Sequence, residues 1–513
     1  MTRGKPPIRT TTTATTTNSA GPAAARIPTL GDAWRAPAAS GGALPSQSVT
    51  VVPWDSMAHE GTVDPHRWSP GSWRNFPAAQ QAEYPDPAAL DRVLAELSQL
   101  PPLAVSWEIV QLRRQLAEAA TGLRFVLQGG DCAERFVDCT SSRITNMLKV
   151  LLQMSLVLVV GAQRPVIRIG RFAGQYAKPR SANLETRGGV TLPSYRGDLI
   201  NQPEFTAEAR TPNPQLLLRG YERAALTLNY IRALIKGGFA DLHHPEYFDL
   251  EWTSHSPFAA EYHRTMETIG ESLQFMESVL GIRAGETDRI DFYTCHEALH
   301  LGYESAQTRT VPRREGFFNL ATHFPWVGLR TNHPDGAHIE YLRGIENPVG
   351  VKVGADTTRE QMVRWMDVLD PHRQPGRLTL IHRLGVKRIG DALPRLIEAA
   401  RAEGGSPLWI CDPMHGNTRT TPSGFKTRHF EDIYSEVEQA FDIHNRLGQR
   451  LGGLHVELTG ENVTECVGGS RGPSEEDLSR AYESEVDPRL NAEQALELAF
   501  LVARKMKSER AGS

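Results

Sequence analysis

The sequence has few of the features that mark secreted, membrane or nucleic-acid-binding proteins. Its 513 residues contain only five cysteines, an odd number at irregular spacing, which argues against a disulfide framework and favours a reducing, cytoplasmic setting. The longest apolar run, at 154–162, is about half of what a membrane span requires. The formal net charge of −4 leaves no basic excess to attract nucleic acid or an anionic membrane. We therefore expect no nucleic-acid or membrane partner.

The start of the chain lacks acidic residues, and the first one is Asp32. Residues 1–60 are rich in Thr, Ala and Pro and carry too little apolar surface to order themselves, so we predict a disordered tail. An acid-poor, hydroxyl-rich start is also typical of a transit peptide, which would direct the protein to a plastid. Both interpretations are open at this point.

The rest of the chain contains eight short runs rich in β-branched and aromatic residues, most of them separated by amphipathic helical patterns. Strands that alternate with helices predict a parallel sheet, and eight such units predict an α/β fold of the (β/α)8 barrel type. We expect an N-terminal helical extension at 61–121 and a catalytic barrel at 122–513. A long insertion after the second strand should hold helices at about 205–285. The eight runs are FVLQGGDC, VIRIGR, DFYTCHE, WVGLR, VGVKV, LTLIHR, LWICDPMH and LHVEL.

Apolar periodicity also predicts individual helices. In the extension we expect them at 88–97 and 106–120, in the insertion at 214–235, and on the barrel at 358–369 and 389–400. The last helix should begin at Asn491, because Gln494 three residues later completes a capping box.

Residues able to bind metal ions or anions stand at the ends of these runs, where barrel enzymes place their active sites. Cys132, His415 and Glu457 each end a different run, and Asp487 precedes the last helix. One thiolate, one imidazole and two carboxylates suit a divalent transition metal such as manganese, cobalt, iron or zinc. The alternatives are a buried apolar cysteine and a hydrogen-bonded loop histidine.

Basic residues form a second set at or just beyond the strand ends. Each could belong to a structural ion pair, but several that converge on one barrel mouth would favour a polyanionic substrate. The set comprises Arg171, Lys178, Arg180, Arg196, Arg330, Lys352, Arg383 and Lys426.

With these residues in place, the chain resembles a known family, the class II (plant-type) 3-deoxy-D-arabino-heptulosonate 7-phosphate (DAHP) synthases. The matching motifs run in order over more than four-fifths of the chain, and the longest of them are specific. They are QGGDCAERF, AGQYAKPRS, LPSYRGDLIN, HEAL, DGAHIEYLRGIENPVGVKVG, DPMHGNT, KTRHF, HVELTGENVTEC and DPRLN.

The resemblance implies a reaction and a set of site residues. Family members condense phosphoenolpyruvate with erythrose 4-phosphate and release phosphate, which is the entry step of the shikimate pathway. The implied metal is divalent, with manganese or cobalt expected, and we expect a homo-oligomer, either a dimer or a tetramer. The implied metal ligands are Cys132, His415, Glu457 and Asp487; the phosphoenolpyruvate contacts are Arg171, Arg330, Lys352 and Arg383; and Lys178, Ser181, Glu297 and Lys426 match positions near the aldose phosphate or the reacting centre. Among these, Lys352, His415 and Arg330 are the expected catalytic residues.

One position departs from the family pattern. Where the family usually reads WVGERT, this chain has WVGLRT, so Leu329 replaces an acid beside Arg330. The change is either drift or the mark of a paralogue that acts on an amino or imino analogue of the aldose phosphate. A different metal-dependent aldolase-type or phosphate-ester enzyme and a non-catalytic regulatory paralogue are the remaining alternatives.

Overall fold

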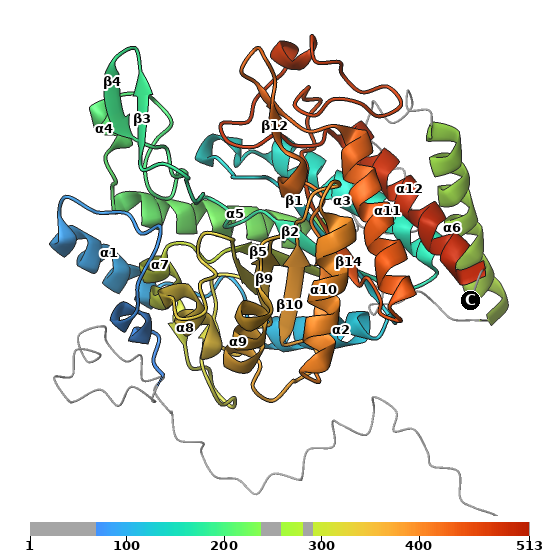
Figure 1. Cartoon of the computed structure of the whole chain (residues 1–513), viewed down its shortest axis with the longest axis horizontal. Helices are drawn as coiled ribbons and strands as arrows, with labels where there is room; N and C mark the ends of the chain where they lie inside the picture. Colours follow the sequence, from blue (N-terminus) through green and yellow to red (C-terminus); the bar gives the residue numbers. More distant parts are fainter. Residues whose placement is uncertain (1–67, 238–257, 281–290, 512–513) are drawn as a thin grey trace, which may run out of the picture. The chain divides into compact units, whose positions relative to one another are not determined.

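The computed structural model describes residues 68–237, 258–280 and 291–511 (Figure 1). The predicted tail at 1–60 and the first residues of the predicted extension lie outside the described residues.

Eight parallel strands close into a barrel in the order β1-β14-β11-β10-β9-β8-β5-β2, so the predicted (β/α)8 architecture is confirmed. Each of the eight predicted runs supplies one strand. Almost every strand residue is buried, as expected for a parallel sheet covered on both faces. The strands are β1 (Phe125–Gly130), β2 (Val166–Arg171), β5 (Phe292–Glu297), β8 (Phe324–Val327), β9 (Val349–Val353), β10 (Leu378–His382), β11 (Leu408–Cys411) and β14 (Gly453–Glu457).

The strand register brings distant site residues to one rim. Gly130, the last residue of β1, pairs with Arg171 of β2 on one side and with Glu457 of β14 on the other. Cys132 follows two residues later. Residues that are nearly 300 positions apart in the chain therefore meet at the C-terminal end of the barrel.

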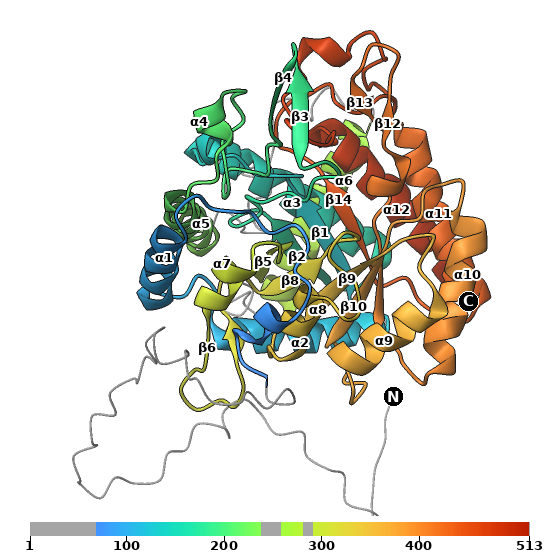
Figure 2. The same ribbon diagram turned by 60° about the vertical axis from the view of Figure 1, so that its left-hand side comes forward.

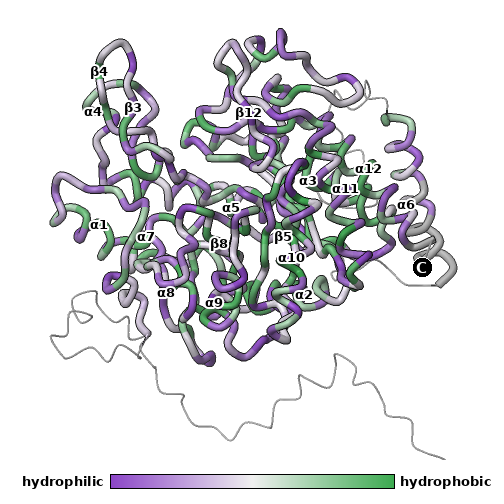
Figure 3. The backbone as a smooth tube through the Cα atoms, viewed as in Figure 1, coloured by the Kyte–Doolittle hydropathy of each residue, from purple (hydrophilic) through white to green (hydrophobic). Residues whose placement is uncertain are grey.

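Helices surround the barrel, and their apolar faces pack against the strands. The stripe predicted at 358–369 is buried, and Thr358 and Gln361 form a capping box at its start. Asn491 and Gln494 form the predicted box before the last helix. In Figure 3, hydrophobic segments gather where strands and helices meet. The surrounding helices are α3 (Ser141–Ala162), α7 (Leu301–Ala306), α8 (Ala337–Arg343), α9 (Arg359–Leu369), α10 (Ile389–Ala402), α11 (Phe430–Arg446) and α12 (Ala492–Ala511).

Among the described helices, α3 alone is long and apolar enough to cross a membrane by length and composition. It packs against α12, β1 and β2, and 67% of its most apolar window is buried. We interpret α3 as a core helix of the barrel wall.

The N-terminal segment contributes the 3-10 turn η3 (Ser72–Asn75), α1 (Pro87–Gln99) and α2 (Ser106–Ala120), so both predicted helices are present. Leu112, Leu116 and Ala119 of α2 join the apolar cluster inside the barrel. Helix α2 lies across the lower end of the barrel in Figures 1 and 2. It therefore closes the N-terminal end and leaves the opposite rim for a site.

The insertion after β2 begins with an antiparallel hairpin, β3 (Leu184–Arg187) and β4 (Val190–Pro193), that the sequence analysis did not predict. Gly188 and Gly189 form its turn with positive φ angles of 56° and 80°. The helices α4 (Ala207–Arg210), α5 (Gln215–Lys236) and α6 (Ala259–Leu280) follow, and α5 matches the predicted 214–235. The remaining short strands are β6 (Thr308–Arg309), β7 (Phe318–Asn319), β12 (Arg419–Thr420) and β13 (Lys426–Thr427). The remaining 3-10 turns are η4 (Phe136–Asp138), η7 (His415–Asn417) and η8 (Leu478–Arg480).

Candidate active site and metal centre

The four predicted metal ligands lie together at the C-terminal rim of the barrel. The donor atoms of Cys132, Glu457 and Asp487 all lie within 4.8 Å of one another. His415 Nε2 lies 3.0 Å from Glu457 Oε1, so its free ring nitrogen faces the same group. Sulfur, nitrogen and carboxylate oxygen donors in one buried cluster fit a divalent transition metal.

Lys178 occupies the centre of this group. Its Nζ lies 2.7 Å from Cys132 Sγ, 2.9 Å from Asp487 Oδ2 and 3.7 Å from Glu457 Oε1. Burial would lower the pKa of Lys178, but the surrounding acids hold that pKa above its ordinary value. Burial, reinforced by Glu457, raises the pKa of the Cys132 thiol to about 12. The cluster therefore requires positive charge, which an ammonium group or a metal ion can supply.

Asp412 connects the metal-ligand group to the substrate cations, a role that the sequence analysis did not assign. Its Oδ2 lies 2.8 Å from His415 Nδ1, which leaves Nε2 turned toward Glu457. The same carboxylate pairs with the Lys352 ammonium group. A second carboxylate behind a ligating histidine fixes its tautomer and orientation.

Lys352 is buried between Asp412 and an aromatic ring. Its Nζ lies 4.9 Å from the centre of the Trp326 ring. Burial lowers the pKa of Lys352 to about 8, with Arg171 and Arg383 acting in the same direction and Asp412 opposing them. A buried cation that is only partly neutralised favours an anionic ligand.

Two adjoining pockets open above these residues. The inner pocket has an empty volume of about 380 Å³, which includes open solvent. Seven of the predicted site residues line it: Lys178, Glu297, Arg330, Lys352, Arg383, His415 and Asp487. The outer pocket encloses about 630 Å³, and its charged and hydroxyl groups come from Lys178, Arg180, Ser181, Glu185, Ser194, Arg330, Lys426 and Asp487. The pockets share Lys178 and Arg330, so ligands bound in the two would be neighbours.

The predicted substrate residues differ in how freely they can reach a ligand. Arg330 donates to Ser181 Oγ at 2.6 Å, Arg383 to the His415 carbonyl at 2.8 Å, and Lys426 Nζ lies 3.0 Å from Asp487 Oδ1. All of these contacts leave other donors for an anion. Arg196 lies apart from both pockets and bonds to Gln80 and Asn183.

Arg171 is buried beside the metal-ligand group. Its side chain is fully buried, pairs with Glu457 at 3.1 Å and contacts His455 Nε2 at 2.6 Å. It does not line the inner pocket. From this position it contributes positive charge and holds Glu457 in place.

Glu297 is one of two carboxyl groups that line the inner pocket, and Asp487 is the other. Its Oε1 is buried and has no hydrogen-bond partner among the described residues. Burial raises the pKa of Glu297, while Lys178 and Lys352 oppose that shift. A Cβ atom at Gly328 would lie 2.4 Å from Oε1, so glycine at this position makes room for the carboxylate.

Two further residues shape the rim without having been singled out from the sequence. Arg428 of the KTRHF motif pairs with Glu457 Oε2 at 2.8 Å. Glu134 accepts hydrogen bonds from the backbone of residues 173–175, the loop that leads to Lys178. The motifs QGGDCAERF and KTRHF contained both residues, but only the folded chain brings them to their partners.

The closed barrel carries a group of mixed metal donors at its rim, beside pockets that are lined by cations. This combination is typical of a barrel enzyme with a metal centre beside a site for polyanions. The model of the class-II DAHP synthetase family matches residues 68–503, and the chain belongs to this family. A divalent metal requirement follows from this membership.

Two relatives extend the comparison. The chain is 47% identical over 438 residues to a phospho-2-dehydro-3-deoxyheptonate aldolase of Streptomyces coelicolor, an alignment that covers 85% of this chain and 97% of the relative. It is 44% identical over 470 residues to a protein of the same name from Neurospora crassa, with 88% and 97% covered.

Proposed function

We propose that the protein condenses phosphoenolpyruvate with D-erythrose 4-phosphate and water to give DAHP and inorganic phosphate, the first step of the shikimate pathway. The observation that carries this proposal is the inner pocket. It places Lys352, Arg383 and Arg330 beside a mixed-donor metal-ligand group at one barrel rim.

Phosphoenolpyruvate fits the inner pocket by charge. It carries a carboxylate and a phosphate, and the pocket offers two guanidinium groups and two ammonium groups, with buried Arg171 close by. Guanidinium groups can grip either anion through two parallel hydrogen bonds. Erythrose 4-phosphate would place its phosphate in the outer pocket, near Ser181 and Lys426.

The reaction joins C3 of phosphoenolpyruvate to the aldehyde carbon of the second substrate. The divalent ion, held by Cys132, His415, Glu457 and Asp487, would act as a Lewis acid on the aldehyde oxygen. Lys178, at the junction of the two pockets, offsets negative charge on either substrate. Water then adds at C2 and phosphate leaves through C–O cleavage.

Glu297 is the residue best suited to take the proton from that water. It lines the inner pocket, its Oε1 has no hydrogen-bond partner among the described residues, and burial raises its pKa. Lys352 and Arg383 hold the departing phosphate while it leaves. Fixing both substrates in adjoining pockets supplies much of the remaining acceleration.

The bound ion is proposed to be manganese or cobalt. Phosphate release from phosphoenolpyruvate, measured with each aldose phosphate in turn, tests the whole proposal. We expect release to depend on erythrose 4-phosphate and to return after metal removal when either ion is added. Release without any aldose would instead indicate a phosphate-ester enzyme, and no release with any aldose or metal would indicate a non-catalytic paralogue.

A second candidate substrate follows from Leu329. Its side chain is 38% exposed, lines the inner pocket beside Arg330 and would lie against any side chain at position 354. Leucine cannot hold the Arg330 guanidinium or reduce the positive field as a carboxylate would. An amino or imino analogue of the aldose phosphate is therefore the alternative substrate.

Leu329→Glu decides between the two substrates. If Leu329 is drift, wild type turns over erythrose 4-phosphate efficiently and the variant changes little. If it marks specialisation, the glutamate shifts the ratio of kcat/KM values toward erythrose 4-phosphate. An unchanged ratio would reject specialisation, and Leu329→Gln separates the effect of charge from that of size.

We further propose that the protein is a dimer or tetramer in a reducing, cytoplasmic compartment. All five cysteines are free in the structure. Light scattering on the purified chain would test the oligomeric state, and localisation of a tagged full-length chain would test the compartment and the plastid alternative.

A further inference from the structure

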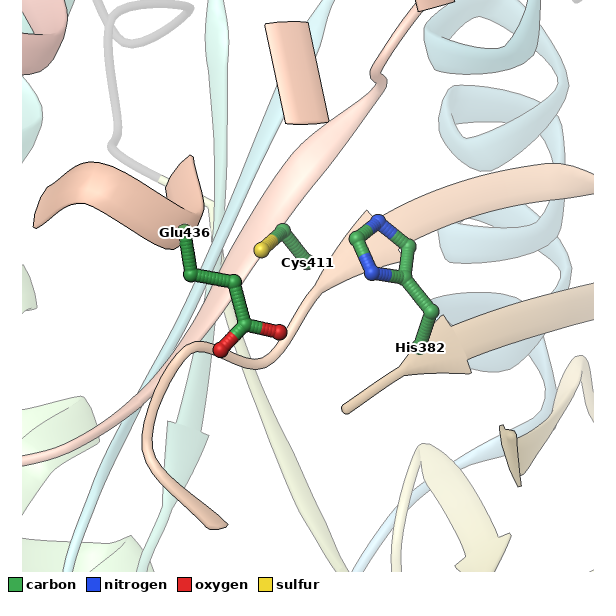
Figure 4. Close-up of side chains that lie close together, drawn as sticks. All are labelled: His382, Cys411 and Glu436. Atoms are coloured by element: carbon green, nitrogen blue, oxygen red, sulfur yellow. The ribbon is translucent and has the colours of Figure 1, made fainter. Parts of the chain in front are cut away.

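A second group of potential metal ligands lies outside the barrel mouth. His382 ends β10, Cys411 ends β11, and Glu436 belongs to α11, which packs on the outside of the strands. His382 and Cys411 are direct partners in the strand register. Figure 4 shows the three side chains converging from these elements.

The orientation of this cluster follows from strand alternation. Ile381 and Ile410, one position earlier, belong to the apolar cluster inside the barrel. Cys411 belongs to the outer core between strands and helices. Successive strand side chains point to opposite faces, so His382 and Cys411 turn away from the substrate pockets. The outer cluster is therefore separate from the metal centre at the rim.

All three side chains are fully buried, and their polar atoms are incompletely satisfied. Neither ring nitrogen of His382 has a hydrogen-bond partner among the described residues. Glu436 pairs with no described lysine or arginine, and burial raises the pKa of its carboxyl to about 8. Buried polar atoms without partners cost on the order of 1–3 kcal/mol each, so a ligand that engages them would be favoured.

Glu436 retains room for a cation. Its Oε1 accepts hydrogen bonds from the backbone N–H groups of Leu384 and Gly385, both at 2.9 Å, and its Oε2 accepts one from Asn417 at 2.7 Å. A carboxylate has about four lone-pair positions, so three hydrogen bonds leave one free.

The spacing is close to what a zinc-like ion needs. The donor atoms of the three residues lie within 4.8 Å of one another. Bonds of roughly 2.3 Å to sulfur and about 2.0–2.2 Å to nitrogen and oxygen place tetrahedral donors about 3.5 Å apart. Closing the group therefore requires side-chain movements of no more than about 1 Å.

We propose that His382, Cys411 and Glu436 form a second, structural binding site for a zinc-class divalent ion, distinct from the metal centre at the barrel mouth. An ion at this site would tie β10 and β11 to α11. His382 is adjacent to Arg383, and Cys411 is adjacent to Asp412, so the site would brace two strands that carry pocket charges.

The test counts ions in the full-length protein. Protein incubated with excess zinc or cobalt and then gel-filtered should retain about two ions per chain by mass spectrometry. Cys132→Ser should retain about one, Cys411→Ala about one, and the double variant close to none. Cys295→Ser is the matched control, because Cys295 is a buried strand cysteine outside both groups and should leave the count unchanged.

Cobalt adds a spectroscopic readout that does not depend on activity. The thiolate-to-cobalt absorption band should persist in Cys132→Ser and disappear when Glu436→Gln is added. The second site is ruled out if Cys132→Ser binds no ion, and this result needs only one folded variant. It would leave the proposed reaction intact.

The opposite pattern concerns the rim. An ion count that is unchanged in Cys132→Ser but reduced in Cys411→Ala would count against the metal centre at the rim.

Discussion

Asp412→Asn should disable the site while leaving the fold in place. Asp412 is fully buried, pairs with Lys352 and holds His415 Nδ1 at 2.8 Å. The substitution keeps the size of the side chain and removes its charge. One change therefore removes the ion-pair partner of Lys352, which is proposed to bind phosphoenolpyruvate, and the hydrogen-bond partner that orients the proposed metal ligand His415.

The magnitude follows from the partners that are lost. A charge-assisted hydrogen bond contributes about 1.5–3 kcal/mol, which corresponds to a roughly 10- to 150-fold loss in kcat/KM for phosphoenolpyruvate. Loss of the residue behind a ligating histidine typically weakens metal binding about 10- to 100-fold. Stability should suffer less, because Lys352 can release its proton. At the wild-type pKa of about 8 that release costs about 1.4 kcal/mol at pH 7, and the lower pKa without Asp412 makes it cost less.

The pH dependence gives the sharpest test. Lys352 carries its charge below a pKa of about 8 and loses it as the pH rises, so kcat/KM for phosphoenolpyruvate should fall on the alkaline side. Asp412 raises that pKa, and its removal should move the decline to lower pH. Asp367→Asn, a change in an exposed ion pair, is the control. An Asp412→Asn enzyme whose alkaline decline stays at the wild-type pH would refute the assigned coupling.

Three further outcomes are expected. Chelation should abolish turnover, manganese or cobalt should restore it, and Cys132→Ser should raise the metal concentration needed; full activity in metal-stripped protein would contradict the rim site. Arg383→Ala should lower kcat/KM for phosphoenolpyruvate roughly 10- to 150-fold, and an effect confined to the aldose phosphate would show the substrate assignment to be wrong. His300 Nδ1 accepts from the Tyr303 N–H, and burial lowers the pKa of His300 to about 4. The unfolded chain therefore binds this proton first, and His300 should contribute about 2 kcal/mol to the fall in the free energy of unfolding between pH 7 and pH 5. Other buried histidines with lowered pKa values, such as His338, add to that fall, so His300→Gln should reduce it by about 2 kcal/mol in urea titrations.

The barrel could be predicted because each of its strands corresponds to a short apolar run in the sequence that ends in a candidate functional residue. The hairpin of β3 and β4 could not, since its strands have only four residues each and are largely exposed. Gly188 and Gly189 were its available signal, and a glycine pair alone does not distinguish a hairpin from a loop.

The metal-ligand group was predictable as a set of residue types, whereas its supporting contacts were not. Asp412 stood in the DPMHGNT motif, but its pairing with Lys352 joins two strands that become neighbours of one pocket only when the barrel closes. For Arg171, the sequence predicted the position at a strand end but not the contacts of its side chain. Only the packing around Glu457 places it close to the pocket.

The ends of β10 and β11 link the rim to the outer core. At each strand end, a residue of the outer cluster is followed by a residue that serves the substrate pocket. His382 precedes Arg383, which lines the inner pocket, and Cys411 precedes Asp412, which pairs with Lys352 of that pocket. Glu436 also holds the backbone directly after Arg383 through Leu384 and Gly385. A shift of either strand end therefore moves a pocket charge and an outer-cluster ligand together. Substitutions in the outer cluster should for this reason alter the KM for phosphoenolpyruvate more than that for the aldose phosphate, whose proposed contacts lie on other elements.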